Sequence, residues 1–152
     1  MATGDVTLFE EYTREIGEKV HDFSNDTLKI GLVDDTLTPL KSRATPKWAD
    51  FVANEVSTGG NYTGDGETIG GTTWTESAGV STLAGESFTL AQDAGGFADA
   101  YWGIIYNDTA TNDEAIAFVE LGGPVSEVAG DVTIKFNGAD VGVAGSICTH
   151  SD

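Results

Sequence analysis

The stretch "AYWGIIYNDTATNDEAIAFVEL", residues 100–121, holds two short apolar runs separated by a polar, turn-forming segment. Both runs are rich in aromatic and β-branched residues, which favour strands. Alternation along a strand puts Trp102, Ile104 and Tyr106 on one face, with Tyr101, Gly103 and Ile105 on the other. We expect one of these faces to lie in a hydrophobic core, and a carbohydrate-stacking platform is the alternative for the exposed aromatic rings.

Similar short runs with period-two patterning, bounded by Gly, Asp and Asn, continue on both sides of this stretch. They predict strands over residues 28–34, 67–75, 87–93, 100–108, 115–121 and 131–137, with a final short strand over 141–147. Residues 46–54 are expected to form a helical turn or a short edge segment. Many short strands without alternating long helices predict a mainly β protein, an antiparallel β-sandwich of Ig-like or jelly-roll-like type.

The N-terminal stretch "TLFEEYTREIGEKV", residues 7–20, has a different period. Apolar residues recur at i+4, and Thr7 with Glu10 fits a capping box, so the pattern predicts one amphipathic α-helix supported by Glu10–Arg14 and Glu15–Lys19 pairs. The sequence therefore divides into an N-terminal arm, residues 1–26, and a β-sandwich domain, residues 27–152. The candidate partner-contact residues of the arm are Leu8, Phe9, Tyr12, Ile16 and Val20, extended by Phe23. The alternative is that the helix covers one end of its own sandwich.

The chain of 152 residues has a formal net charge of −18, distributed unevenly. Residues 1–47 carry six of the seven basic residues, whereas residues 48–152 contain sixteen acidic residues and only Lys135. Such a surface repels phosphate groups, so nucleic acid and anionic membranes are not expected partners. Solubility or adaptation to salty surroundings explains the charge, with an acid-specific binding function as the alternative.

The glycine-rich stretch "ANEVSTGGNYTGDGETIGG", residues 53–71, resembles neither phosphate-binding fingerprint and has no nearby Lys or Arg. Asn61, Thr63, Asp65 and Glu67 place oxygen ligands at alternating positions, which is a weak calcium-site candidate. The bidentate Glu of a calcium loop is missing, because position 72 is Thr. A loop connecting strands is the favoured interpretation.

Other chemistry is not indicated by the residue pattern. His21 and His150 lack neighbouring ligand or nucleophile motifs, and Cys148 stands alone as the single cysteine, which favours synthesis in a reducing cytosol. The N-terminus has no signal-peptide pattern, and no run is long enough for a membrane span. We therefore predict a non-enzyme without metal or cofactor, neither conventionally secreted nor membrane-embedded.

Five segments, taken in order, resemble a family of small virion proteins of tailed double-stranded DNA viruses. They are "LKIGLVDDTLTP" (28–39), "WADFVANEVSTGGNYTGDGETIGG" (48–71), "AYWGIIYNDTA" (100–110), "AIAFVELGG" (115–123) and "DVTIKFNGADVGV" (131–143). The likeness covers about residues 28–145 and rests on motif order. The chain departs from the family pattern where Asn61 separates Gly60 from Tyr62, and where "GDGE" (64–67) replaces a shorter glycine run.

The resemblance implies an assembly function, most simply a capsid decoration or cement protein that stabilises the head shell. A head-completion or tail structural protein is the first alternative, and a carbohydrate-binding module using Trp74 or Trp102 is the second. Implied partners are the major capsid protein, other virion proteins and further copies of the chain, with a trimer favoured. The implied location is the virion, on the capsid surface, after synthesis in the host cytoplasm.

Overall fold

Thirteen short elements, mostly strands, make up the computed structural model, which describes residues 4–151. In chain order they are β1 (Val6–Leu8), α1 (Tyr12–Gly17), β2 (Leu28–Val33), the 3₁₀ helices η1 (Trp48–Asp50) and η2 (Val52–Asn54), β3 (Glu67–Thr68), β4 (Thr73–Ser77), β5 (Val80–Glu86), β6 (Phe88–Leu90), β7 (Ala100–Asn107), β8 (Ala115–Val125), β9 (Val132–Ile134) and β10 (Ala144–Ser151). The predicted mainly β fold is confirmed.

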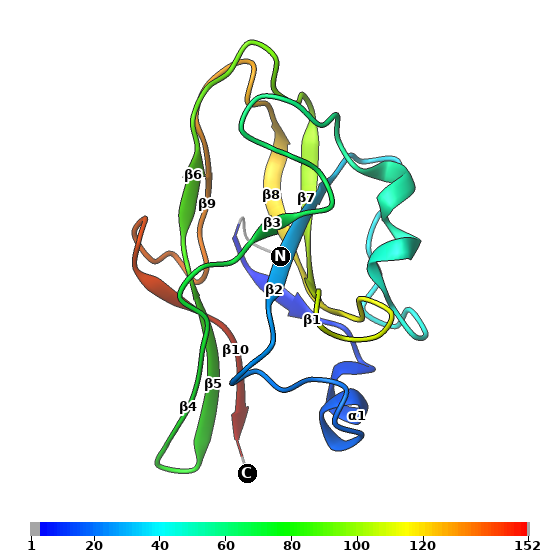
Figure 1. Cartoon of the computed structure of the whole chain (residues 1–152), viewed down its shortest axis with the longest axis vertical. Coiled ribbons are helices and arrows are strands. Elements are labelled where there is room, and N and C mark those ends of the chain that lie inside the picture. The colour runs from blue at the N-terminus through cyan, green and yellow to red at the C-terminus, as the bar shows by residue number, and fades with distance from the viewer. Residues whose placement is uncertain (1–3, 152) are drawn as a thin grey trace.

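The strands form two layers (Figure 1). One is a five-stranded antiparallel sheet in the order β1-β8-β7-β2-β3. The other contains a three-stranded sheet, β10-β5-β4, and a two-stranded sheet, β6-β9. Only Ser87 separates β5 from β6, so the two small sheets follow one another along the same layer. The arrangement is sandwich-like, as predicted.

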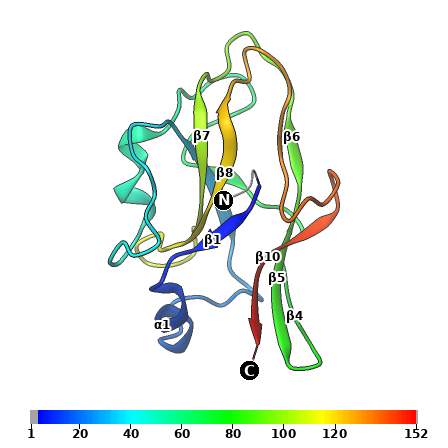
Figure 2. The ribbon, with the colours of Figure 1, turned by 180° about the vertical axis from the view of Figure 1, so that it is seen from behind.

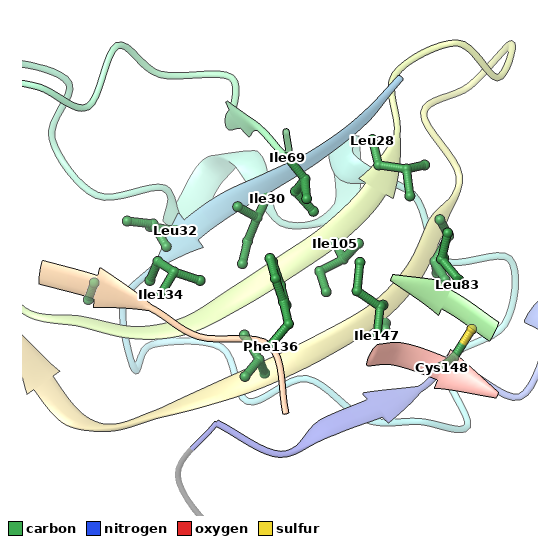
Figure 3. Packing of buried hydrophobic residues seen from close by; sticks show 14 of the residues in the cluster. Leu28, Ile30, Leu32, Ile69, Leu83, Ile105, Ile134, Phe136, Ile147 and Cys148 are labelled. Carbon is green, nitrogen blue, oxygen red and sulfur yellow. The ribbon is translucent and has the colours of Figure 1, made fainter. Parts of the chain in front are cut away.

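The main core lies between these layers. Inward-facing residues of β2 and β7, such as Ile30 and Ile105, meet Leu83 of β5 and Ile147 of β10 (Figure 3). Phe136, which follows β9, fills the middle and is fully buried. Burying each such side chain contributes on the order of 1.5–3 kcal/mol, so this cluster is the main source of stability.

A second cluster covers the outer face of the large sheet. It joins Ile104 and Tyr106 of β7 to Phe9, Trp48 and Phe51 from outside the sheet. The rings of Trp48 and Tyr106 stack with centroids 5.1 Å apart and planes 5° from parallel. Residues 34–56 thus give β7 a covered second face, which explains its nearly continuous apolar sequence. The alternation predicted for β7 is correct, but both of its faces are buried rather than one.

The predicted helix over residues 7–20 is wrong at both ends. Residues 6–8 form β1, which pairs with β8 through Val6 and Val119, and the helix occupies only residues 12–17. Backbone pairing with a long, buried strand outweighs the weak helix preference of a segment containing Gly17. Thr7 therefore lies in a strand and does not begin a capping box.

The ion pairs predicted for that helix also differ. Arg14 pairs with Glu11 and with Glu18, the latter at 2.8 Å, rather than with Glu10. Glu10 lies 3.8 Å from Lys41, and Glu15 contacts His21 instead of Lys19. These differences follow from the short helix, because a residue outside it no longer keeps i to i+4 spacing with one inside it.

The strands predicted over residues 28–34, 100–108 and 115–121 agree with β2, β7 and β8, although β8 continues to Val125. β6 and β9 are shorter than the predicted 87–93 and 131–137, and β10 begins and ends later in the chain than the predicted 141–147. Residues 67–75 form two strands, β3 and β4, separated by a turn at residues 70–71. β5 was not predicted, because "VSTLAGE" (80–86) alternates only weakly between apolar and polar residues. It is nevertheless the central strand of its sheet, lying between β10 and β4.

Candidate functional site

The four calcium candidates do not converge on one point, although Thr63 and Glu67 are hydrogen-bonded to each other. The Asn61 side chain donates to the Ala91 carbonyl, whereas Thr63 donates both its N–H and its hydroxyl to Glu67. Asp65 takes a positive φ of 51° and its carbonyl accepts a hydrogen bond from the Tyr106 hydroxyl. The described residues contain no group of three or more His, Cys, Asp or Glu side chains that could hold a metal. This stretch is organised as a connection between strands.

Its third carboxylate, Glu55, has the same kind of internal role. Its Oε1 accepts hydrogen bonds from the Tyr62 hydroxyl at 2.6 Å and from the Gly66 N–H at 3.4 Å. The same hydroxyl accepts the N–H of Leu32, so the loop is fastened to β2. Glu55 and Glu67 therefore position the backbone of this loop through their carboxylates.

One buried carboxylate, that of Glu127, lies where its own loop meets the loops that contain Gly60 and Gly96. Glu127 is fully buried, and its Oε1 accepts the N–H of Asn61 at 2.7 Å. Its Oε2 has no hydrogen-bond partner and packs against Gly96, while Gly60 lies against Oε1. Glycine is needed at both positions because a Cβ there would press on the carboxylate. Sequence patterning missed Glu127, since it lies in a stretch interpreted only as a turn.

The two histidines contact other parts of the molecule. His21 is buried beside Asn107. The side-chain oxygen of Asn107 accepts the N–H groups of Thr109 and Ala110, so its side-chain nitrogen is the atom that donates to Nδ1 of His21, at 3.0 Å. Nε2 of His21 then donates to Glu15 at 3.2 Å, which requires a neutral imidazole. His150 lies on β10, with its ring stacked on Tyr12 at 5.6 Å. His21 therefore holds the N-terminal segment through hydrogen bonds, and His150 contacts it through ring stacking.

The N-terminal contact residues are divided between core and surface. Phe9 and Tyr12 are each 1% exposed and Phe23 is 6% exposed, so these three belong to the cores and present no surface to a partner. Leu8 and Ile16 are partly buried against the main core, and Val20 is half-buried. Most apolar residues of this segment pack against the cores, and α1 lies at one end of the molecule (Figure 1). The helix covers one end of its own fold, the alternative left open by the sequence.

An open groove lies between β8 and β9. Figure 2 shows the ribbon from the side on which β8 and β1 are nearest the viewer. The volume of the groove is about 480 Å³. Val119, Leu121 and Val125 line it from β8, and Val132 and Ile134 line it from β9. Its walls are largely apolar.

One wall of the groove contains a large bulge in β8. Trp102 of β7 is opposite Glu120, but Ala100 is opposite Val125, so two steps along β7 correspond to five along β8. Gly122 and Gly123 have φ values of 86° and 101°, a region that favours glycine. The sequence "LGGPV" (121–125) predicts a chain break, yet the strand continues through it. The Gly-Gly-Pro sequence of this bulge was the one feature of the sequence that could have indicated the groove, although the pattern by itself predicts only a turn.

A second, more polar groove adjoins the first and shares Gly4 with it. It lies between β1 and β10, has a volume of about 700 Å³, and is lined by residues that include Val6, Ser146 and Thr149. Both grooves lie along one side of the molecule. On this side no strand of the described residues is shared between the large sheet and the two small sheets, which Figure 2 shows as separate layers. We call this side the open seam.

The surroundings of the apolar groove are mainly acidic, with exposed valines nearby. Glu120 and Asp131 line it together with Lys135, which lies 3.7 Å from Asp140. Val128 is 38% exposed in the loop that joins β8 to β9. Val141 and Val143, both more than half exposed, lie in the loop that begins near Gly138 at the groove. Exposed apolar residues beside an apolar groove are typical of a protein-binding face.

The two tryptophans considered for carbohydrate stacking are partly buried. The ring centroids of Trp102 and Phe118 lie 6.0 Å apart in an edge-on arrangement, and those of Trp74 and Phe23 lie 5.3 Å apart.

The single cysteine is also internal. Cys148 is buried, and its Sγ lies 3.1 Å from the Tyr12 hydroxyl. Burial raises the pKa of its thiol, which disfavours the nucleophilic thiolate.

Comparison with protein-family models, with curated proteins and with solved structures found no match to this chain. No helix within residues 4–151 has the length and apolar character needed to cross a membrane. The residues of the open seam form a surface suited to binding another protein.

Proposed function

We propose that this chain is a virion structural protein of a tailed virus, most simply a decoration or cement protein on the head shell. The observation that carries the proposal is the open seam, with an apolar groove between two strand-bearing walls. A groove of this kind suits a segment of protein chain better than a small polar substrate. The motif order described above supports the same class of function.

The charge distribution supports an outward-facing acidic body. Residues 48–152 carry a single basic residue, Lys135, so this part of the surface repels nucleic acid and remains hydrated. We propose the major capsid protein as the main partner. Self-association, with a trimer favoured, would supply the multivalent attachment that weak single contacts need.

Carbohydrate binding is a weaker candidate. The Trp74 and Trp102 rings both pack against internal aromatic rings, and each is only partly accessible. Loss of saturable glycan binding in a Trp102→Ala variant would favour this alternative over the assembly function.

The test is attachment to particles. Virions from the virus that encodes the chain would be purified and the copies of the chain counted by quantitative mass spectrometry and cryo-electron microscopy. A decoration protein is expected in hundreds of copies on the shell, whereas a few copies at the neck or tail would favour the head-completion or tail alternative. Absence from purified particles would contradict the proposal in every form.

A further inference from the structure

We propose that the groove between β8 and β9 receives an extended segment of another virion protein, which adds as a strand to the outer edge of β9 and carries Lys or Arg on both sides of its apolar residues. This inference rests on the proposed assembly function. It specifies the partner's conformation and charge and the surface that binds it.

The backbone of β9 provides the first reason. β9 pairs with β6 through three residues, and its sheet has no other strand within the described residues. Its second edge therefore lies beside the groove, where β8 bulges away. A strand edge presents N–H and C=O groups that an incoming extended chain can pair with.

The side chains provide the second reason. Val132 and Ile134 alternate with the exposed Thr133 and Lys135 along β9. The incoming strand would share this period of two, so every second side chain would face the groove. The apolar side chains of the incoming strand would lie beside those of β9 and would face Val119 and Leu121 of β8 across the groove.

Charge decides between a partner protein and a second copy of this chain. Each copy brings a net charge of −18, and the groove already contains Glu120 and Asp131. The Lys135 ammonium lies 3.7 Å from Asp140, and Asp131 accepts the N–H of Gln92. A segment flanked by cations complements this rim, whereas an acidic copy would be repelled.

The binding test uses a defined probe, an acetylated and amidated peptide of sequence Lys-Val-Thr-Val-Thr-Val-Lys. Two control peptides isolate its features: one has Glu at both ends, and the other has Pro in place of the central Val, which removes a backbone donor. Isothermal titration calorimetry would measure affinity. Amide exchange followed by NMR would test whether additional β9 amides become protected, as strand pairing requires.

The groove can be blocked with little cost to the fold. Gly130 lines it, and a Cβ placed on Gly130 meets nothing within 4 Å, so Gly130→Trp adds a large side chain without an immediate clash. Gly130→Ala is the conservative control. Gly17→Trp is the matched control, because Gly17 is equally open but lies in α1, away from the groove residues.

The expected result is that Gly130→Trp weakens binding of the Lys-flanked peptide about tenfold or more, while Gly130→Ala and Gly17→Trp change it less than about twofold. The Glu-flanked and Pro peptides should bind at least about tenfold more weakly. Equal binding by Gly130→Trp, no binding to the wild-type protein, or unprotected β9 amides would overturn the inference.

Two further measurements separate this inference from the proposed function. If sedimentation shows that Gly130→Trp abolishes self-association, the occupant is a second copy and the assignment of a partner segment is wrong. If Gly130→Trp occupies shells as fully as wild type, the groove inference fails while the structural function stands. If the wild-type protein is absent from particles, the structural function fails, and the peptide titration still decides whether the groove accepts a strand.

Discussion

The hydroxyl of Tyr12 lies 3.1 Å from Sγ of Cys148, which joins the first helix to the last strand across 136 positions of sequence. Both side chains are buried in the main core. The contact shows how the N-terminal segment, whose helix preference is weak, is attached to the sandwich through Tyr12.

Removing this hydroxyl is expected to destabilise the protein modestly, whereas removing the ring should do so severely. Tyr12→Phe should lower the free energy of unfolding by about 1 kcal/mol, and Tyr12→Ala by about 3–5 kcal/mol because a cavity replaces the ring. Urea denaturation followed by circular dichroism measures both. Thr13→Ala, at an exposed neighbouring position, is the control. Equal stability of Tyr12→Ala and wild type would mean that the N-terminal segment does not contribute to the core.

Gly31 is expected to tolerate no side chain while Trp48 is present. A Cβ on Gly31 would overlap the Trp48 ring, which is 5% exposed and stacked on Tyr106. Gly31→Ala should therefore cost about 1–3 kcal/mol through overpacking and alter tryptophan fluorescence. Combining it with Trp48→Ala should cost less than the sum of the two single changes. Strict additivity in this double-mutant cycle would show that the two residues do not contact each other.

The buried tyrosines predict a loss of stability at alkaline pH. Burial raises the pKa values of Tyr12, Tyr62 and Tyr106 above the ordinary value of about 10. The folded state thus holds protons that the unfolded state releases, so the stability they contribute is complete below about pH 10 and decreases as pH rises above it. Absorbance at 295 nm should show these three ionising together with unfolding. Early, reversible ionisation of all the tyrosines in the folded state would contradict this prediction.

The net charge of −18 predicts that salt stabilises the fold. The screening length decreases from about 30 Å at 0.01 M to about 3 Å at 1 M salt, which weakens repulsion among the carboxylates. The melting temperature should therefore rise steadily with NaCl concentration. An uncharged osmolyte at matched osmolality is the control, and an equal response to both would show that charge screening is not the cause.

Strands with a clear period of two were predictable because their pattern is local. β2 and β7 were located almost to the residue, since their apolar residues are dense and bounded by turn-forming Asp and Asn. β5 was missed because Ser, Thr and Gly interrupt its apolar residues, and because one of its two neighbours, β10, follows it by 58 to 71 positions, from the pair Glu86–Ala144 to the pair Val80–Ser151. Residues 7 and 8 were assigned to a helix because their pairing with β8 is not visible locally.

The candidate site was less predictable than the fold. The open seam depends on which strands become sheet edges and on a bulge at residues 121–124, and neither is encoded in a short motif. Glu127 is likewise surrounded by Gly60 and Gly96, which come from other loops. The carboxylates of residues 53–71 were visible in the sequence, but their internal hydrogen bonds were not.

The sequence by itself determined the mainly β class, most strand positions and the acidic surface, because composition and alternation act on neighbouring residues. Only the tertiary structure decided that Phe9, Tyr12 and Phe23 lie in the cores and that β9 borders an open groove. Burial and edge exposure depend on long-range pairing, where the hydrophobic gain from packing distant segments outweighs local preference.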